Sequence, residues 1–150
     1  MLAKKKQIHQ QCLFEIQKKI ERIQQAMEDI QAAANEETKS SAGDKYETGR
    51  AMMQQEKDKL ASQLAANLAS KNQLERLNLD ELNNFVQQGS LVSTNEGYYY
   101  ISVPLGKIKW EEETYYAIST ISPIGGALLG KKAGDILNFQ HRSIVIREVS

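Results

Sequence analysis

Two carboxylates stand three residues apart in the segment Gly43-Asp44-Lys45-Tyr46-Glu47. Carboxylate oxygens are ligands that Mg²⁺ prefers, but two acids alone bind this ion poorly. The same spacing is also a capping box, in which Asp44 is the N-cap of a helix and the Glu47 carboxylate accepts a hydrogen bond from the Asp44 N–H. The two interpretations are compatible, because negative charge is favourable at a helix N-terminus. The sequence leaves both open.

Cys12 lies three residues after His9, so the two side chains would occupy neighbouring positions on a helix and could form a nucleophile and its base. We interpret Cys12 instead as a residue that packs between helices, because an extended helical hairpin offers no substrate pocket. The chain has a single cysteine and two histidines, His9 and His141, which does not suit a zinc site. We expect no cofactor of its own.

The 19 basic and 19 acidic residues of the chain cancel. Sequence-independent binding to nucleic acid draws its affinity from an excess of Lys and Arg, so this balance favours a protein partner. No apolar run approaches the roughly 20 residues of a membrane span, which predicts a cytoplasmic protein with no membrane partner. Residues 130–132 lack the glycine spacing and the hydroxyl of a phosphate-binding loop, and we expect no small-molecule substrate.

The carboxylate pair lies between two stretches with helical periodicity. In the first stretch, apolar residues recur at alternating steps of three and four, which is a heptad pattern. They are Leu13, Ile16, Ile20, Ile23, Met27, Ile30 and Ala34. The second stretch, residues 46–77, has an apolar stripe that consists of Met53, Leu60, Leu64 and Leu68. These stripes predict an antiparallel coiled-coil hairpin over residues 1–77 with its tip near residues 43–47, and pairing between two chains is the alternative.

After residue 77 the composition changes towards residues that favour strands. We expect a linker at residues 78–88 and a small β-rich domain at residues 89–150, with strands that pair antiparallel. The expected strands are residues 91–93, 97–103, 114–119, 135–139 and 143–149, and a charged stretch at residues 109–113 precedes the third of them. Ser122 and Pro123 suit the N-cap and first position of one short helix, which Gly130 ends. The predicted fold class is α+β.

The segment around this short helix has a distinctive pattern. Ser122-Pro123-Ile124 is followed by Leu128-Leu129 and by Gly130-Lys131, and Asp135 opens the next strand. This pattern resembles the C-terminal signature of the GreA/GreB family of bacterial transcription elongation factors. The resemblance implies an FKBP-like domain that docks on RNA polymerase, with Ser122, Pro123 and Ile124 as candidate partner-binding residues. In that family the domain stands beside an N-terminal coiled-coil hairpin, so the resemblance covers nearly the whole chain.

The acidic segment is similar to the Gly-Asp-x-x-Glu of the hairpin tips in the same family. The resemblance implies that the tip enters the secondary channel of RNA polymerase. There Asp44 and Glu47 would act as catalytic and metal-binding residues, completing the ligands of a weakly held Mg²⁺ in the polymerase active centre. The protein would stimulate cleavage of backtracked RNA, contact the RNA 3′ end only indirectly, and be no enzyme by itself.

The residues after Glu47 depart from the family pattern. The tips of the family usually continue Glu-Asn-Ala-Glu-Tyr, whereas this chain continues Glu47-Thr48-Gly49-Arg50-Ala51. Because a shared fold does not fix activity, two alternatives stay open. The protein could regulate polymerase from the secondary channel without stimulating cleavage, or it could be a coiled-coil dimerisation or adapter protein.

Overall fold

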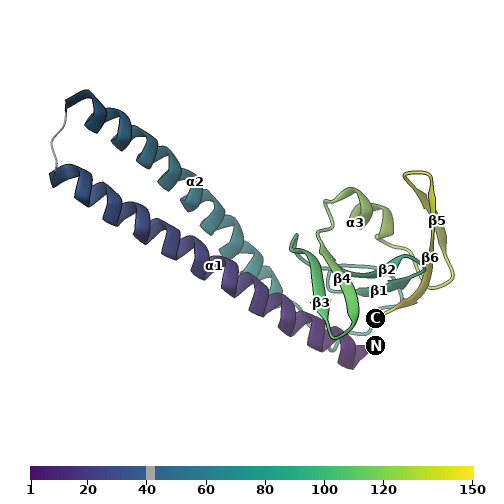
Figure 1. Cartoon of the computed structure of the whole chain (residues 1–150). Coiled ribbons are helices and arrows are strands. Elements are labelled where there is room, and N and C mark those ends of the chain that lie inside the picture. The colour runs from purple at the N-terminus through teal and green to yellow at the C-terminus, as the bar shows by residue number, and fades with distance from the viewer. Residues whose placement is uncertain (40–42) are drawn as a thin grey trace. The chain divides into compact units, whose positions relative to one another are not determined.

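A computed structural model describes the backbone of residues 1–39 and 43–150 and the side chains of residues 1–36 and 48–150. It contains two compact units, of which the first joins Met1–Glu15 to Ser70–Ser150 and the second is Ile16–Ala69. Two long helices precede a six-stranded sheet with one short helix, which confirms the predicted α+β class (Figure 1). No helix in the described ranges is both long and apolar enough to cross a membrane. The FKBP-like character of the sheet stays a prediction.

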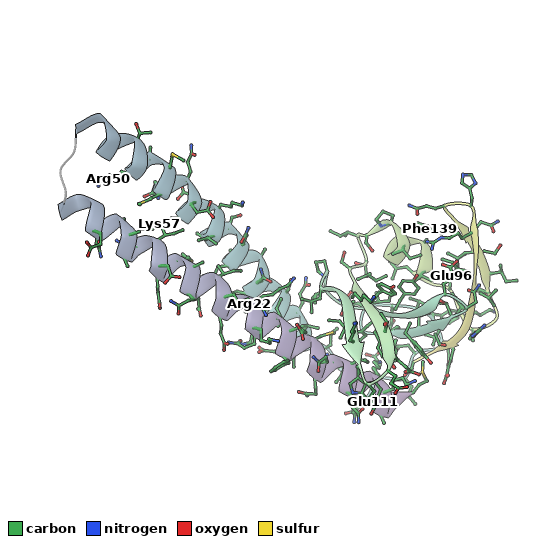
Figure 2. The ribbon with its side chains drawn as sticks, in the orientation of Figure 1. Arg22, Arg50, Lys57, Glu96, Glu111 and Phe139 are labelled. Carbon is green, nitrogen blue, oxygen red and sulfur yellow. The ribbon has the colours of Figure 1, made fainter. Side chains whose placement is uncertain are left out.

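The unit Ile16–Ala69, which we call the helical hairpin, is formed by α1 (Leu2–Lys39) and α2 (Gly43–Arg76). The helices pair antiparallel within one chain, because Lys57 Nζ of α2 donates a hydrogen bond to Gln31 Oε1 of α1 at 2.6 Å (Figure 2). Farther from the tip, Arg22 of α1 and Asn67 of α2 line one small cleft. The pairing within one chain agrees with the predicted hairpin.

The seam of α2 differs from the predicted stripe. Leu68 is expected to be part of it, but its side chain is 43% exposed, and Asn67 is half-buried instead. A heptad series of buried and half-buried positions runs along this helix. It consists of Met53, Lys57, Leu60, Leu64, Asn67, Lys71 and Leu74. Polar residues at seam positions specify the register of paired helices at a cost in stability. Because polar residues occupy part of this seam, the apolar residues alone do not show where it runs.

The other unit, which we call the sheet unit, contains all six strands. They are β1 (Leu91–Thr94), β2 (Gly97–Ile101), β3 (Gly106–Trp110), β4 (Glu113–Ile118), β5 (Ile136–Phe139) and β6 (Arg142–Val149), with α3 (Pro123–Leu128) between β4 and β5. Their order in the sheet is β3-β4-β2-β1-β6-β5. The first fifteen residues of the chain, from α1, belong to the same unit.

Two features of the sheet contradict the predictions. The charged stretch belongs partly to a strand, because β3 runs from Gly106 to Trp110 and pairs antiparallel with β4. Only Ile108 is buried in β3, and the exposed Lys107 and Lys109 are typical of an edge strand, which hides the apolar alternation. The second feature is that β2 and β4 pair parallel, with Tyr98 opposite Tyr115. This follows from β3, which runs back along the edge so that β4 returns in the direction of β2.

The sheet buries side chains on both faces, because successive strand residues point in opposite directions. On one face, Tyr99 and Ile101 belong to an apolar core that includes Leu128 of α3. On the other face, Tyr100 is fully buried, and its hydroxyl lies 2.8 Å from Nδ1 of His9 in α1. The short helix α3 therefore covers one face, and the start of α1 covers the other.

Residues 78–88 contribute to the sheet unit near their end. Val86 is 2% exposed and belongs to the apolar core. Its N–H donates to the carbonyl of Lys131 at 2.8 Å, and its carbonyl accepts from the N–H of Gly130 at 2.8 Å. These bonds hold the segment against the residues that follow α3.

Candidate functional site

The acidic pair predicted at the hairpin tip lies in the first turns of α2, which begins at Gly43. The side chains of residues 37–47 lie outside the described residues, so the carboxylates of Asp44 and Glu47 do too. Their role as Mg²⁺ ligands stays a prediction. The predicted capping box is wrong in its position, because α2 already includes Gly43 and Asp44 therefore lies within the first turn and not at the N-cap. Among the described side chains, no group of three or more His, Cys, Asp or Glu residues is placed to hold a metal ion.

Ser122, the first of the predicted docking residues, holds the start of α3. Its hydroxyl accepts a hydrogen bond from the Gly125 N–H at 3.1 Å and donates one to the Ser119 carbonyl at 2.7 Å. Pro123 occupies the first turn, where a backbone N–H is not needed. After the helix, Gly130 has a φ of 76°, the left-handed conformation expected of the residue that ends it. The predicted N-cap, proline and terminating glycine are confirmed.

Gly125 makes this turn possible through close packing. A Cβ atom built on Gly125 would lie 2.0 Å from the carbonyl oxygen of Ser119 and 2.7 Å from Oγ of Ser122. The same carbonyl oxygen accepts the hydrogen bond from the Ser122 hydroxyl. The loop before α3 and the first turn of the helix can therefore approach each other only because residue 125 has no side chain.

The exposed part of this turn differs from the predicted set. Ser122 and Ile124 are half-buried, and Ile124 packs against the apolar core, so only Pro123 is exposed. The neighbouring Ile121 is 93% exposed, the largest value among the large apolar side chains that the structure describes. A residue before the N-cap usually packs on the fourth helical residue, but that residue here is Gly126, which offers no side chain. Gly126 is the sequence signal for an exposed Ile121, a residue that is not among the predicted docking residues.

Comparison with known proteins gives one solved structure. No protein-family model matches the chain, and no curated protein matches it. A chain described as "Structure of the transcription factor Gfh1" is similar at 19% sequence identity, with 91% of this chain and 92% of that chain covered. The TM-score is 0.35, which is too low to establish a common fold or to assign a function.

His9 and Cys12 are both buried where α1 packs on the sheet, and no hydrogen bond joins their described side chains. His9 contacts the Tyr100 hydroxyl instead, and burial, followed by the nearby Lys5 ammonium, lowers the pKa of His9. Burial and the Glu15 carboxylate raise the pKa of the Cys12 thiol to about 12. A thiol of this kind stays protonated and unreactive at neutral pH, which agrees with a packing role for Cys12.

Lys4 joins the first turn of α1 to two strands. Its Nζ atom lies 3.0 Å from Oε2 of Glu113 and 4.6 Å from the centroid of the Tyr98 ring. The Tyr115 hydroxyl donates to the same carboxylate, and together with Lys4 it lowers the pKa of Glu113. Because both Lys4 and Glu113 are partly exposed, we expect this ion pair to add little to stability and to serve mainly in positioning the helix.

His9 leads to a prediction on acid stability. Its lowered pKa means that the folded protein keeps His9 neutral, while the unfolded chain binds a proton as the pH falls below about 6.5. The stabilisation that comes from keeping His9 neutral is fully present above that pH, and it is lost as the pH falls towards the pKa of His9 in the folded protein. The free energy of unfolding should therefore fall between about pH 7.5 and pH 5. The total decrease should be about 1.4 kcal/mol for each unit by which the pKa of His9 is lower in the folded protein than in the unfolded chain.

The measurement is urea unfolding of the wild type and of His9→Gln across this pH range. Gln keeps hydrogen-bonding capacity towards Tyr100 but does not titrate, so the variant should lose less stability on acidification. The carboxylates Asp80 and Glu113, whose pKa values are lowered, lose their contributions only at lower pH. An equal loss in both proteins would contradict the assignment to His9.

Proposed function

We propose that this protein is a transcription factor that binds bacterial RNA polymerase through its C-terminal domain and stimulates cleavage of backtracked RNA from the secondary channel. The polymerase would hold the Mg²⁺ and catalyse the hydrolysis, and this chain would supply the carboxylates of Asp44 and Glu47. Such a factor works in the cytoplasm, where transcript and polymerase meet.

The observation that supports the proposal most is the signature at residues 122–135 together with its geometry. Ser122 caps α3, and Leu128 at the end of the helix has a fully buried side chain. Gly130 follows the helix in the left-handed conformation. The turn built in this way leaves Ile121 and Pro123, two positions apart, both exposed. Exposed apolar side chains on an ordered turn favour contact with a protein partner.

The hairpin supports the second part of the proposal through its length and its acidic start. The 34 residues of α2 span about 51 Å at the usual helical rise, enough to reach along a channel. In two-metal hydrolysis, one ion stabilises the leaving oxygen and the other holds the attacking water. Two carboxylates at the tip would add hard oxygen ligands for the second ion, which the polymerase holds only weakly by itself.

One observation favours a second candidate function, regulation from the same channel without cleavage. The family resemblance stops after Glu47, and Gly49 and Arg50 follow inside α2. Glycine within a helix costs about 1 kcal/mol relative to alanine, so the first turns of α2 are intrinsically weak. A tip that holds its carboxylates differently would still occupy the channel but would not position the second Mg²⁺.

Binding to polymerase is tested with Ile121→Asp. An aspartate at this position would bring an unpaired charge into the proposed interface, and we expect the affinity for RNA polymerase core enzyme to fall about tenfold or more. The matched control is Ile136→Asp on β5, since Ile136 is also an exposed isoleucine, at 67%. Biolayer interferometry with immobilised polymerase measures both variants. Equal affinities for the wild type and Ile121→Asp would place the contact elsewhere, and absence of any binding would contradict the proposed function.

A further inference from the structure

The sheet has two edge strands, and they differ in how they are protected. An edge strand presents unpaired N–H and C=O groups, and exposed lysines are one device that keeps other chains from pairing with it. At one edge, β3 carries the exposed Lys107 and Lys109. At the other edge, β5 has the sequence Ile-Leu-Asn-Phe, without a charge or a proline, and Ile136 is 67% exposed (Figure 1). The edge at β5 is therefore open to pairing.

The turn between β5 and β6 fixes which of their residues exchange hydrogen bonds. Phe139 pairs with Arg142 across residues 140–141, whose φ angles of 49° and 64° suit a two-residue type I′ hairpin. The pair that closes such a hairpin is hydrogen-bonded, and hydrogen-bonded pairs then alternate along the strands. The alternation continues to Asp135, whose carbonyl accepts from the Ile146 N–H at 2.9 Å.

This alternation divides the backbone groups of β5 into two sets. Those of Phe139 and Leu137 face β6, and those of Ile136 and Asn138 face away from it. Within the described part of the chain, no backbone hydrogen bond joins Ile136 or Asn138 to a segment beyond β6. The edge therefore presents two N–H donors and two C=O acceptors, which is the set of groups that an extended strand pairs with.

A second copy of β5 matches all four of these groups. The outward groups of Ile136 and Asn138 lie symmetrically on either side of Leu137. In an antiparallel pair with the two Leu137 residues opposite each other, each Ile136 exchanges two hydrogen bonds with Asn138 of the second copy. The arrangement is closed by a two-fold axis, so it ends at two copies.

The side chains of β5 also suit a second copy. Leu137 packs against the apolar core, and Phe139 lies on the same face; both are half-buried and have surface left to cover. The two Leu137 side chains would meet at a non-hydrogen-bonded pair, where side chains approach most closely, and each Phe139 would reach the opposite Leu137 diagonally. Because β5 carries no charge and the chain has a net charge of zero, no like-charge repulsion within the strand pair or between the whole chains opposes this contact.

We propose that two copies of this chain associate through β5, so that their sheets continue across the interface. Four strand residues from each copy bury less than the roughly 800 Å² per partner of a stable interface, and the dimer is therefore weak. We expect a dissociation constant on the order of 100 µM. The association does not depend on the polymerase function proposed above.

The test combines sedimentation equilibrium with amide hydrogen exchange of the full-length chain, from about 10 µM to 1 mM. We expect monomer at the lowest concentration and mainly dimer at the highest. At ten times the dissociation constant, about one fifth of the chains are still monomeric by mass action. Exchange of the Ile136 and Asn138 amides should therefore slow about fivefold, whereas the Leu137 and Phe139 amides are already bonded to β6 and should change less. A monomer throughout this range, or unchanged exchange at Ile136 and Asn138, would overturn the proposal.

Asn138→Pro tests the register directly. Proline has no N–H, so this variant removes one outward donor from each copy and no backbone bond to β6. We expect the dissociation constant to rise about tenfold or more. The matched control is Lys109→Pro on β3, because Lys109 also precedes the closing residue of a two-residue hairpin, and its N–H faces the opposite edge of the sheet. An equal loss of association in Lys109→Pro would overturn the assignment to β5.

Ile136→Lys is a second variant, which leaves the backbone unchanged. It gives β5 the edge charge that β3 already has, and in the dimer it would place two like charges diagonally across the axis. We expect a loss of association similar to that of Asn138→Pro, with the melting temperature near that of the wild type. Association as strong as that of the wild type in this variant would overturn the proposal. Affinity for polymerase is measured at nanomolar concentrations, where this dimer is dissociated, so failure here would leave polymerase binding untouched.

Discussion

Replacing Gly125 by alanine is expected to lower the free energy of unfolding by about 3 kcal/mol, one of the larger effects of a single methyl group. The added Cβ would lie 2.0 Å from the Ser119 carbonyl oxygen and 2.7 Å from Ser122 Oγ. The backbone must move to relieve the first contact, and such a movement breaks the hydrogen bonds that hold the N-cap. In a chain of this size the melting temperature should fall by about 6–12 °C.

Gly126→Ala is the matched control for this prediction. Its Cβ would meet the Thr120 carbonyl oxygen at 3.5 Å, an ordinary contact, and alanine favours helix over glycine. We therefore expect a neutral or slightly stabilising effect, up to about 1 kcal/mol. Differential scanning calorimetry of the wild type and both variants measures the difference. A similar melting temperature for the two variants would show that the close approach at Gly125 is not what limits this turn.

The parts of the fold that could be predicted from sequence depend on local patterns. The heptad pattern of α1 and the N-cap and terminating glycine of α3 involve residues a few positions apart, and their physical causes act over the same distance. The strand β3 could not be found in this way, because Lys107 and Lys109 face solvent at the edge of the sheet. The parallel pairing of β2 with β4 depends on the course of the whole chain and has no local signal.

Local sequence patterns also predict some residues of the candidate site and not others. Ser122 and Pro123 follow from helix-capping rules, but the exposed Ile121 depends on the absence of a side chain at Gly126. The contact of His9 with Tyr100 joins residues 91 positions apart, so no spacing in the sequence indicates it.

Asp44 should have the largest effect on activity. If its carboxylate binds Mg²⁺ in the complex, Asp44→Asn should lower the rate of stimulated RNA cleavage on the order of 100-fold, because the metal contributes several kcal/mol to the transition state. Asn matches Asp in size and keeps a side-chain carbonyl oxygen, so this variant removes the charge and little else. Asp44→Ala removes the whole polar group. Full activity in Asp44→Asn with a loss in Asp44→Ala would mean that Asp44 acts without its negative charge and is not a metal ligand.

We propose that this chain acts on RNA in the polymerase active centre. Adding the protein to a purified backtracked elongation complex with Mg²⁺, and following the length of the labelled transcript, tests this most directly. We predict that the RNA is shortened from its 3′ end with the wild type and not with Asp44→Asn. An unchanged transcript, at a protein concentration that saturates binding to the same complex, would contradict stimulated cleavage.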